Sequence, residues 1–588
     1  MSNEVTLSEK NSSSDAAASS AKETQKKADA KKAADKSQDD DDYNWNDFLS
    51  LVLGFLKKWG WAVLLGFSVL LIAYYTLLPS RNYFHSDTTD TLMWAVASKE
   101  GGGLFNKDFN YACLLPFGTS MIMYLLIPLF GVSMKTHVIG MLIFFLMLTG
   151  AFVWMLREMK WSWGWISGAV FTLLFICSGS EKLREIFWGH TIYYSLAVLF
   201  QFVGLALLFR CFDSIDRLDK ITDSEKRKYQ MISVYVAAGL LFLWFALTGM
   251  NQIITIATFS LPVIGAVFCE RWLDHQAKPA NRKNLQALAL IGVMAAGMLV
   301  GFVITKVEAK DIVAGYEGAF SNYAAMDSWV EHVNGFPRAW FSLLGVDMRD
   351  GEKLMSFQSV GNLLMVIAGT VILIVPVIAL FCYQKFEDRK TRVLILSHWI
   401  MTLLIMFGYI FGKLSSANWR LSPIVGMSTV VTFVFFRWAA SQIQWQRLIS
   451  LAMIPVFLVC SITAVKIIKM PADKTEDNHL YKIAEALEAQ NLSYGYATFW
   501  NANGVTVCSD SKVKVRNVTI DDNGCTPYRY QSCNNWYEGE KDHEGLYFLL
   551  MDGGERDKLI GSDLDTSKIG ELSLEGYTVW LYTSNIFG

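Results

Sequence analysis

The chain has 588 residues, of which 53% are hydrophobic and only 18% are charged. Soluble domains carry about 25% charged residues, so this composition excludes a soluble secreted enzyme, a disordered scaffold and a coiled-coil rod, and it indicates an integral membrane protein. The 52 basic and 54 acidic residues give a net charge of −2, which offers no electrostatic footprint for a nucleic acid.

Residues 1–42 consist mainly of Ala, Ser, Lys and Asp and end in the four aspartates of 39–42. Such a segment cannot bury enough apolar surface to offset the entropy lost on ordering. No apolar stretch of the kind found in a signal peptide follows the first residues. We therefore expect 1–42 to be a disordered cytoplasmic tail.

Long apolar stretches follow this tail. A helix that crosses a membrane needs about 20 predominantly apolar residues, and eleven stretches meet this requirement. A twelfth apolar stretch, 114–132, contains two prolines. The eleven predicted spans are 60–79, 137–156, 163–179, 190–210, 231–248, 250–269, 286–305, 358–382, 393–411, 421–437 and 448–466.

Lys and Arg near the span ends predict the orientation, because short cytoplasmic loops are enriched in both. Lys57 and Lys58 precede the first span, which places the N-terminus in the cytoplasm. The basic loop 157–160 requires the span 137–156 to run inward, so that 114–132 cannot cross and should lie on the outer face as a juxtamembrane or re-entrant helix. The other basic loops are 210–228, 271–283 and 385–392, with Arg437 and Arg447 marking one more.

The spans predict a transmembrane domain over 43–469 with two large outer loops, 80–135 and 306–356, and an extracytoplasmic C-terminal domain over 470–588. In this last domain, apolar residues recur at helical spacing over 479–490. Strand-like runs follow, separated by Gly, Asn and Asp. The predicted strands are 494–500, 504–508, 512–520, 546–551 and 576–583, and they indicate a small α/β or α+β domain.

The first outer loop carries three aspartates, Asp87, Asp90 and Asp108, close to the membrane border. A carboxylate there is costly unless it is hydrated, paired or bound to a metal, which makes each of them a functional candidate. Asp87 and Asp90 are three residues apart and would share one face of a helix. The alternative is structural, with Asp87 capping the helix that starts there and Asp90 in its first turn.

The stretches FHSDTTD (84–90) and DFNYACLLPFG (108–118) give this loop a resemblance to the GT-C superfamily of multi-span glycosyltransferases. The superfamily includes the protein O-mannosyltransferase and aminoarabinose transferase types, which take sugars from polyprenyl-phosphate donors at the outer face of the membrane. The resemblance implies that Asp87 is the acidic residue following the first span and that 114–132 is a juxtamembrane helix. The family often has His-Pro-Pro where the second stretch has Leu-Leu-Pro.

A second part of the resemblance lies in GKLSSANWR (412–420). Members of the superfamily place an Arg-Tyr element followed by a proline there, with the Arg near the lipid phosphate; here Arg420 is followed by Leu421 and Pro423. A phosphate at the membrane interface needs a fixed cation, and Lys413 is a second candidate. The alternative is that Arg420 only reaches toward the interface from a helix end.

Loop 180–190, SEKLREIFWGH, has many ionisable side chains for a short outer loop. They could line a donor or acceptor site, with His190 in hydrogen bonds to sugar or phosphate, or they could form ion pairs in a solvated loop. Loop 306–356 contains aromatic residues that would stack on sugars or form an interfacial belt, and the resemblance implies that this loop is a mobile lid. The candidates in this loop are Tyr316, Tyr323, Trp329, His332 and Trp340.

Three of the nine cysteines, Cys508, Cys525 and Cys533, lie in the predicted outer domain. On an oxidising face two of them could form a disulfide, most simply Cys525 with Cys533, which would leave the third unpaired. A structural zinc site needs four ligands, and no fourth Cys lies near these three. The sequence requires no cofactor, but a divalent metal held by Asp90 or Asp108 stays open.

We therefore hypothesise that the protein transfers a sugar from a polyprenyl-phosphate donor to an acceptor hydroxyl at the outer face of the cell membrane, with inversion. Asp87 would be the general base, and a basic residue would stabilise the departing phosphate. The acceptor would be a protein, a polymer or a lipid. The predicted substrate-binding residues are Asp90, Asp108, His190, Lys413 and Arg420.

Three alternatives stay open. A transporter or lipid flippase would carry ionisable residues near the middle of its spans, and the predicted spans have very few. A non-catalytic scaffold that presents 470–588 would leave the acidic first loop without a role. A polysaccharide polymerase or ligase of another fold would use the basic residues of loop 306–356, which are Lys306, Lys310, Arg338, Arg349 and Lys353.

Overall fold

The computed structural model describes residues 25–27, 45–277, 281–312, 321–349, 351, 353, 355–442, 444–539 and 543–587. Most of the predicted tail, 1–42, lies outside the described residues. The chain falls into two compact units, residues 1–63 and residues 64–588. The second unit contains most of the predicted spans and the C-terminal domain.

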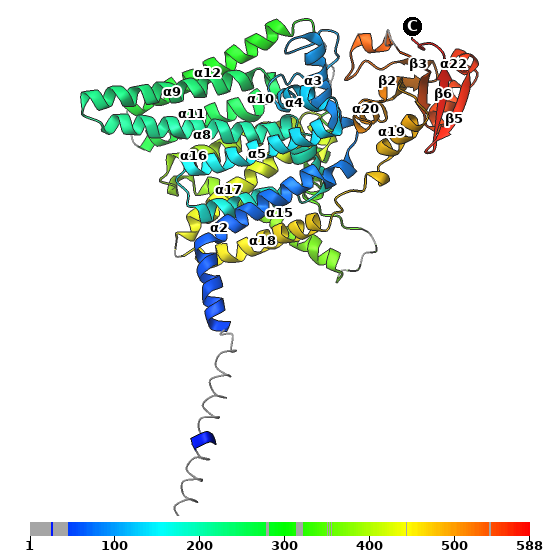
Figure 1. Cartoon of the computed structure of the whole chain (residues 1–588). Coiled ribbons are helices and arrows are strands. Elements are labelled where there is room, and N and C mark those ends of the chain that lie inside the picture. Colours follow the sequence, from blue (N-terminus) through cyan, green and yellow to red (C-terminus); the bar gives the residue numbers. More distant parts are fainter. Residues whose placement is uncertain are drawn as a thin grey trace, which may run out of the picture. The chain divides into compact units, whose positions relative to one another are not determined.

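Apolar helices make up most of this second unit (Figure 1). Among the described residues, ten helices are long and apolar enough to cross a membrane, and an eleventh candidate is the pair 163–176 and 181–189, bent by 116°. Each of the eleven predicted spans overlaps one of these, so the predicted multi-pass helical membrane protein is confirmed. The helices are α2 (Trp45–Leu77), α5 (Met134–Glu158), α6 (Trp163–Ile176) with α7 (Glu181–Arg184) and η3 (Glu185–Gly189), α8 (Tyr193–Lys220), α9 (Ser224–Gly249), α10 (Gln252–Thr255) with η4 (Ile256–Ser260) and α11 (Leu261–Ala277), α12 (Asn281–Glu308), α15 (Phe357–Phe381), α16 (Arg389–Ile410), α17 (Ser422–Ala440) and α18 (Gln446–Ile468).

The helices α8 and α17 lie at the centre of the bundle. In their most apolar stretches 89% and 83% of the residues are buried inside the protein, against 22% in α9. α8 packs against α5, α9 and α17. The apolar outer surface of a helix such as α9 is therefore left for lipid, in which an exposed apolar side chain carries no penalty.

Small residues allow α9 and α12 to approach closely. Gly297 and Gly301 are four residues apart on α12, on one face of the helix. A Cβ atom at Gly301 would overlap the carbonyl oxygen of Ala246, and one at Gly297 would overlap that of Phe242. This spacing of small residues is typical of close helix contacts in membranes.

The apolar stretch 114–132 forms the short helix α4 (Thr119–Phe130). Its 12 residues extend about 18 Å at 1.5 Å per residue, whereas the hydrocarbon core of a membrane is about 30 Å thick. The helix is therefore too short to cross, in agreement with the charge pattern. It packs against α3 (Asp90–Gly101) and α5. Which face of the membrane each end occupies stays a prediction.

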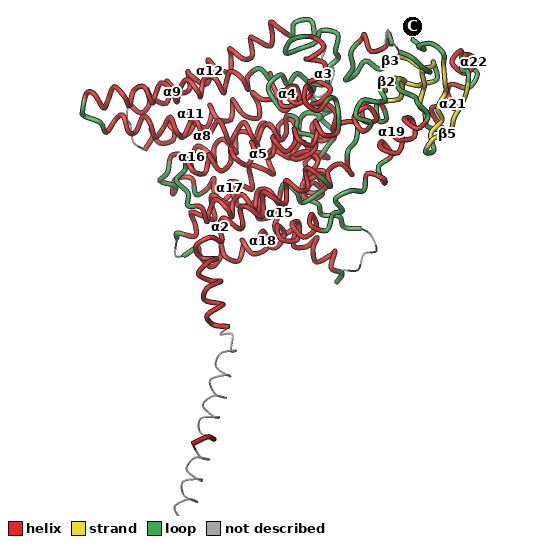
Figure 2. The backbone as a smooth tube through the Cα atoms, viewed as in Figure 1, coloured by secondary structure: helices red, strands yellow, loops and turns green. Residues whose placement is uncertain are grey.

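The C-terminal part contains a mixed six-stranded sheet, drawn in yellow in Figure 2. The strand order is β3-β2-β1-β4-β6-β5, with β1 parallel to β2 and β4 and the other pairs antiparallel. The small sheet domain is thus as predicted. The strands are β1 (Tyr494–Thr498), β2 (Lys514–Asp521), β3 (Gly524–Pro527), β4 (Tyr547–Met551), β5 (Gly570–Leu574) and β6 (Tyr577–Tyr582), and the helices are α19 (His479–Ala489), α20 (Ala502–Cys508), α21 (Gly553–Leu559) and α22 (Asp563–Ser567).

One predicted strand is wrong and two strands were not predicted. Residues 504–508 are helical, in α20. Val and Thr favour a strand locally, but α20 is packed between α19, β2 and the turn η2 (Ser86–Thr89), and such tertiary contacts override a weak local preference. The unpredicted strands, β3 and β5, lie at the two edges of the sheet.

The disulfide that Cys525 and Cys533 could have formed is not present, because both are free cysteines. Cys525 lies in β3, opposite Ile520 of β2. Cys533 is fully buried, and its Sγ donates to Glu100 Oε2 at 3.5 Å. The two residues therefore serve different contacts, one in the sheet and one against the first outer loop.

Candidate active site

The acidic residues of the first loop begin directly after α2. The chain turns through η1 (Pro79–Tyr83) and η2 (Ser86–Thr89), so that Asp87 lies in η2 and Asp90 is the first residue of α3. Within η2, Thr89 Oγ1 donates to the carbonyl oxygen of Ser86 at 2.7 Å. The N-cap of α3 is Thr89 and its side chain makes no cap bond, so the helix-capping role considered for Asp87 is not what the structure shows.

Asp90 and His190 form a buried pair. His190 Nε2 lies 3.3 Å from Asp90 Oδ2, and each residue is only 7% exposed. Burial raises the pKa of Asp90, against the hydrogen bond from His190. Burial lowers the pKa of His190, but the hydrogen bond and charge of Asp90 outweigh it and raise that pKa. The two side chains therefore hold a proton between them as one unit.

A second set of charged groups lies in the segment before His190. Lys182 Nζ is 2.5 Å from Glu185 Oε2, and His85 Nε2 is 3.5 Å from the same oxygen. The Lys182 ammonium also lies 4.7 Å from the centre of the Trp419 ring. The Glu185 side chain is only 15% exposed, so these groups form a packed cluster rather than a freely solvated loop.

The buried pair, Lys182 and Glu185 line a polar cavity of about 140 Å³. Three of the residues predicted from the sequence, Asp87, Asp90 and His190, line it together. The cavity thus joins the first outer loop to the segment that precedes α8. The other lining residues are Ala112, Cys113, Lys182, Glu185, Ile186, Ile192, Tyr193, Tyr194, Trp419 and Tyr530.

A more apolar cavity of about 180 Å³ adjoins the polar one, because Cys113, Tyr193 and Tyr194 line both. Arg420 lines this second cavity and is only 5% exposed. Its Nη1 donates to the carbonyl oxygen of Lys413 at 2.7 Å and to Ser416 Oγ at 2.8 Å, so the guanidinium is held in place. The remaining lining is Ile253, Ile254, Thr258, Ser321, Ile405, Leu414 and Pro423.

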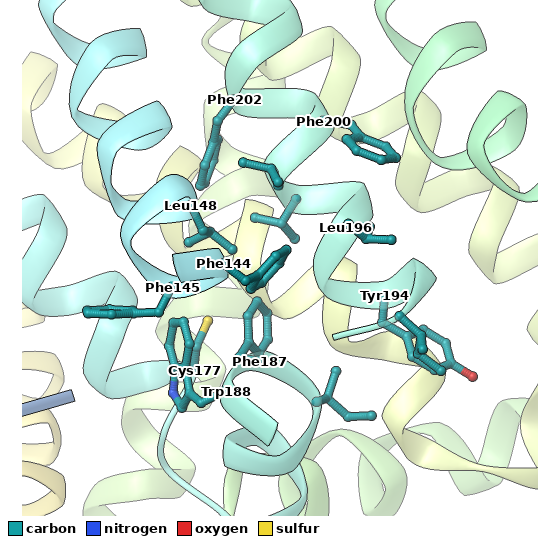
Figure 3. Packing of buried hydrophobic residues seen from close by; sticks show 14 of the residues in the cluster. Phe144, Phe145, Leu148, Cys177, Phe187, Trp188, Tyr194, Leu196, Phe200 and Phe202 are labelled. Carbon is teal, nitrogen blue, oxygen red and sulfur yellow. The ribbon is translucent and has the colours of Figure 1, made fainter. Parts of the chain in front are cut away.

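Buried aromatic residues belong to the same packed core as Tyr194, which lines both cavities (Figure 3). Trp188 packs edge-on against Phe145 of α5 at 5.3 Å, and its Nε1 donates to Ser178 Oγ at 2.8 Å. Phe187 lies in the same cluster as Tyr194. Close packing of large rings leaves few alternative positions, so the segment carrying His190 and Tyr194 is fixed.

The other predicted residues lie elsewhere. Lys413 lines a third cavity of about 610 Å³, and its backbone oxygen accepts a hydrogen bond from Arg420. Asp108 is exposed, and its carbonyl oxygen accepts from Asn534 N at 3.0 Å. The structure therefore does not bring these two side chains into either of the adjoining cavities, and their proposed roles stay predictions.

The loop 306–356 contributes little to the two cavities. Of its described residues, only Ser321 lines either one. Trp340 is buried and donates to the carbonyl oxygen of Gly369 at 3.2 Å, which is a packing role. Tyr316 lies outside the described residues. Among the residues that the structure describes, no group of three or more His, Cys, Asp or Glu side chains could hold a metal ion.

Sequence reasoning missed four aromatic residues of the polar cavity, Tyr193 and Tyr194 close to His190, and Trp419 and Tyr530. Trp419 directly precedes Arg420 in the sequence, so the prediction of Arg420 could have been extended to Trp419. Tyr530 belongs to the C-terminal domain, in a segment without any recognisable motif. Nothing in its local sequence indicates that it lies beside Asp87.

No protein-family model matches the sequence, and no curated protein matches it. Solved structures similar to the chain include ArnT from Cupriavidus metallidurans bound to undecaprenyl phosphate, with 12% identity and a TM-score of 0.49 over 90% of this chain and 99% of that one. The apo form of ArnT has 13% identity and a TM-score of 0.40 over the same shares. The Archaeoglobus fulgidus oligosaccharyltransferase in complex with Zn and sulfate has 11% identity and a TM-score of 0.39, over 86% of this chain and 71% of that one. With TM-scores below 0.5, these likenesses assign neither an architecture nor an activity to this chain.

Proposed function

We propose that this protein is a membrane glycosyltransferase that moves a sugar from a polyprenyl-phosphate donor to an acceptor hydroxyl. One observation carries the proposal. A polar cavity with Asp87 and the Asp90–His190 pair shares a wall with a more apolar cavity that contains the buried cation Arg420. Each feature matches one part of the reaction. The carboxylate of Asp87 suits an acceptor hydroxyl, the guanidinium of Arg420 suits a phosphate, and the apolar cavity suits a lipid chain.

In the proposed reaction, Asp87 takes the proton of the acceptor hydroxyl as the oxygen attacks the anomeric carbon. The bond between that carbon and the phosphate oxygen breaks on the opposite side, which inverts the configuration. The departing polyprenyl phosphate carries the negative charge away, and Arg420 stabilises it because a fixed guanidinium binds phosphate through more than one hydrogen bond.

The remaining polar groups of the cavity would bind the sugar. Asp90 and His190 can accept and donate hydrogen bonds to sugar hydroxyls while they share their proton. Trp419 would offer a ring face to the apolar side of the sugar. The predicted orientation places both cavities toward the outer face of the membrane, where the donor would enter from the lipid.

The proposal is tested by transfer of radiolabelled sugar from a panel of polyprenyl-phosphate sugars, with purified protein and membrane extract as the source of acceptor. We expect the wild type to transfer sugar. Asp87→Asn should lower the transfer rate at least about 100-fold, because a positioned base contributes about 10²–10⁴-fold to the rate. The control Asp477→Asn should transfer sugar at the rate of the wild type. Asp477 has a side chain 65% exposed and lies outside both cavities.

Two outcomes would count against the proposal in different ways. Equal transfer by the wild type and Asp87→Asn would keep the enzyme but place its base elsewhere. No transfer from any donor in the panel would refute the glycosyltransferase itself, and the transporter and scaffold alternatives would then take precedence.

A further inference from the structure

The C-terminal domain packs directly against the turn that carries Asp87. Ser86 Oγ, beside Asp87, donates to the carbonyl oxygen of Trp500 at 2.8 Å. Asn478 Nδ2 donates to the carbonyl oxygen of Phe84 at 2.9 Å. These bonds join the first residue of η2 and the backbone just before it to the loop before α20 and to the start of α19, so the domain holds the backbone that leads into Asp87.

A second contact pairs the segment 528–536 of the domain with the first outer loop. Gln531 N donates to the carbonyl oxygen of Asn110 at 2.8 Å, and Asn110 N donates to that of Ser532 at 3.1 Å. Phe109 and Cys533 form an antiparallel bridge. The two segments therefore hydrogen-bond as neighbouring strands do, which fixes the position of side chains along 528–536.

This pairing buries Gln531 next to Asp90. Gln531 is 1% exposed, and its Oε1 accepts from Trp94 Nε1 at 2.7 Å and from Ala112 N at 3.4 Å. Two donors on Oε1 fix the orientation of the amide, which leaves Nε2 for Asp90. Burial raises the pKa of Asp90, and Gln531, like His190, opposes that rise. Gln531 Nε2 and Asp90 Oδ1 are both buried, and neither atom has a hydrogen-bond partner among the described residues, so each is available to the other.

The preceding residue, Tyr530, lines the polar cavity but not the apolar one. Its ring packs against Phe499 and Tyr528 of the same domain, with centroids 5.6 Å away in both cases. Arg420 marks the side from which the phosphate leaves, and Asp87 marks the side from which the hydroxyl attacks. Tyr530 shares the cavity of Asp87, so it lies on the acceptor side.

We propose that the C-terminal domain completes the active site, with Tyr530 as a specificity-determining residue for the acceptor and Gln531 as a positioning residue that holds Asp90 opposite His190. The inference rests on the proposed function. It assigns the domain a place in the reaction, because two consecutive residues of one docked segment reach the cavity and the buried pair beside it.

The role of Tyr530 is tested with Tyr530→Ala, Tyr530→Phe and the control Arg529→Ala, which changes an exposed neighbour outside the cavity. Transfer is measured while the donor is titrated at fixed membrane extract, and while the extract is titrated at fixed donor. We expect Tyr530→Ala to raise the extract needed for half-maximal transfer about 3- to 10-fold, as an aromatic contact is worth, with the KM for the donor unchanged. Tyr530→Phe should stay near the wild type.

A change in the donor KM alone, or Tyr530→Ala equal to Arg529→Ala, would overturn the acceptor role of Tyr530. Absence of transfer in the wild type would refute the proposed function instead, so the two failures are distinguishable.

The role of Gln531 is tested by the pH profile of transfer in Gln531→Leu, with Gln531→Glu as the polar variant and Gln490→Leu, at an exposed glutamine of the same domain, as the control. Asp87 and His190 also act on Asp90 and are unchanged in these proteins. Because Gln531 lowers the pKa of Asp90, its removal should move the acidic limb of the profile to higher pH. A lower rate with an unmoved profile would show that Gln531 only supports the fold.

Discussion

Replacement of Arg420 tests the phosphate end of the site, and the size of the effect follows from its surroundings. The guanidinium is 5% exposed and is fixed by bonds of 2.7 and 2.8 Å to Lys413 O and Ser416 Oγ. Removal of one pre-oriented donor to a developing negative charge costs about 2.7–4 kcal/mol, or about 10²–10³-fold in kcat. We expect Arg420→Gln to lose that much activity.

The matched variants separate charge from geometry. Arg420→Lys keeps the charge but cannot bond two groups as a planar fork does, so its loss should be smaller than that of Arg420→Gln. Arg338→Gln changes an exposed Arg of the third cavity and should stay near the wild type. Arg338 is also a residue on which the polymerase alternative would depend.

The assay is the initial rate of transfer as a function of donor concentration, with the thermal unfolding midpoint of each variant measured in parallel. The midpoint is needed because Arg420→Gln also breaks two hydrogen bonds of a charged group, each worth about 1.5–3 kcal/mol of stability. A folded Arg420→Gln protein with a kcat within about threefold of the wild type would refute the assignment of Arg420 to the phosphate. Equal losses in Arg420→Gln and Arg338→Gln would refute it as well.

Three further outcomes follow from the structure. Alkylation of the unfolded, unreduced protein should label all nine cysteines, as free thiols, and mass spectrometry showing seven labels would contradict this. Gly301→Leu should lower the unfolding midpoint, because the Cβ of the new side chain would overlap the backbone of Ala246. The control Gly292→Ala should not lower it, because the space around Gly292 is open. Equal midpoints for the two variants would contradict the close packing of α9 and α12. Burial lowers the pKa of His190, but the hydrogen bond and the charge of Asp90 outweigh it and raise that pKa. The stabilisation of the folded protein by this pair is therefore complete below the ordinary histidine pKa of about 6.5 and is lost as the pH rises through the raised value. The difference in midpoint between the wild type and Asp90→Asn should therefore shrink with rising pH, and a constant difference would contradict the ion pair.

The sequence alone determined the membrane architecture. Apolar runs of about 20 residues define spans without any tertiary information, because a backbone in lipid must satisfy its hydrogen bonds within each helix. Charge counting also predicted that 114–132 does not cross the membrane, in agreement with the 12-residue length of α4. Asp87 and Arg420 could be singled out because short motifs near span ends resemble a known superfamily.

Only the tertiary structure decided how these residues combine. It paired Asp90 with His190 and brought Tyr530 from the C-terminal domain into the polar cavity. It left Asp108 and Lys413 outside the two adjoining cavities. It also made 504–508 helical. The reason is that hydropathy and residue preference report on neighbours along the chain, whereas a cavity is formed by segments hundreds of residues apart, whose contact depends on the packing of every helix and strand between them.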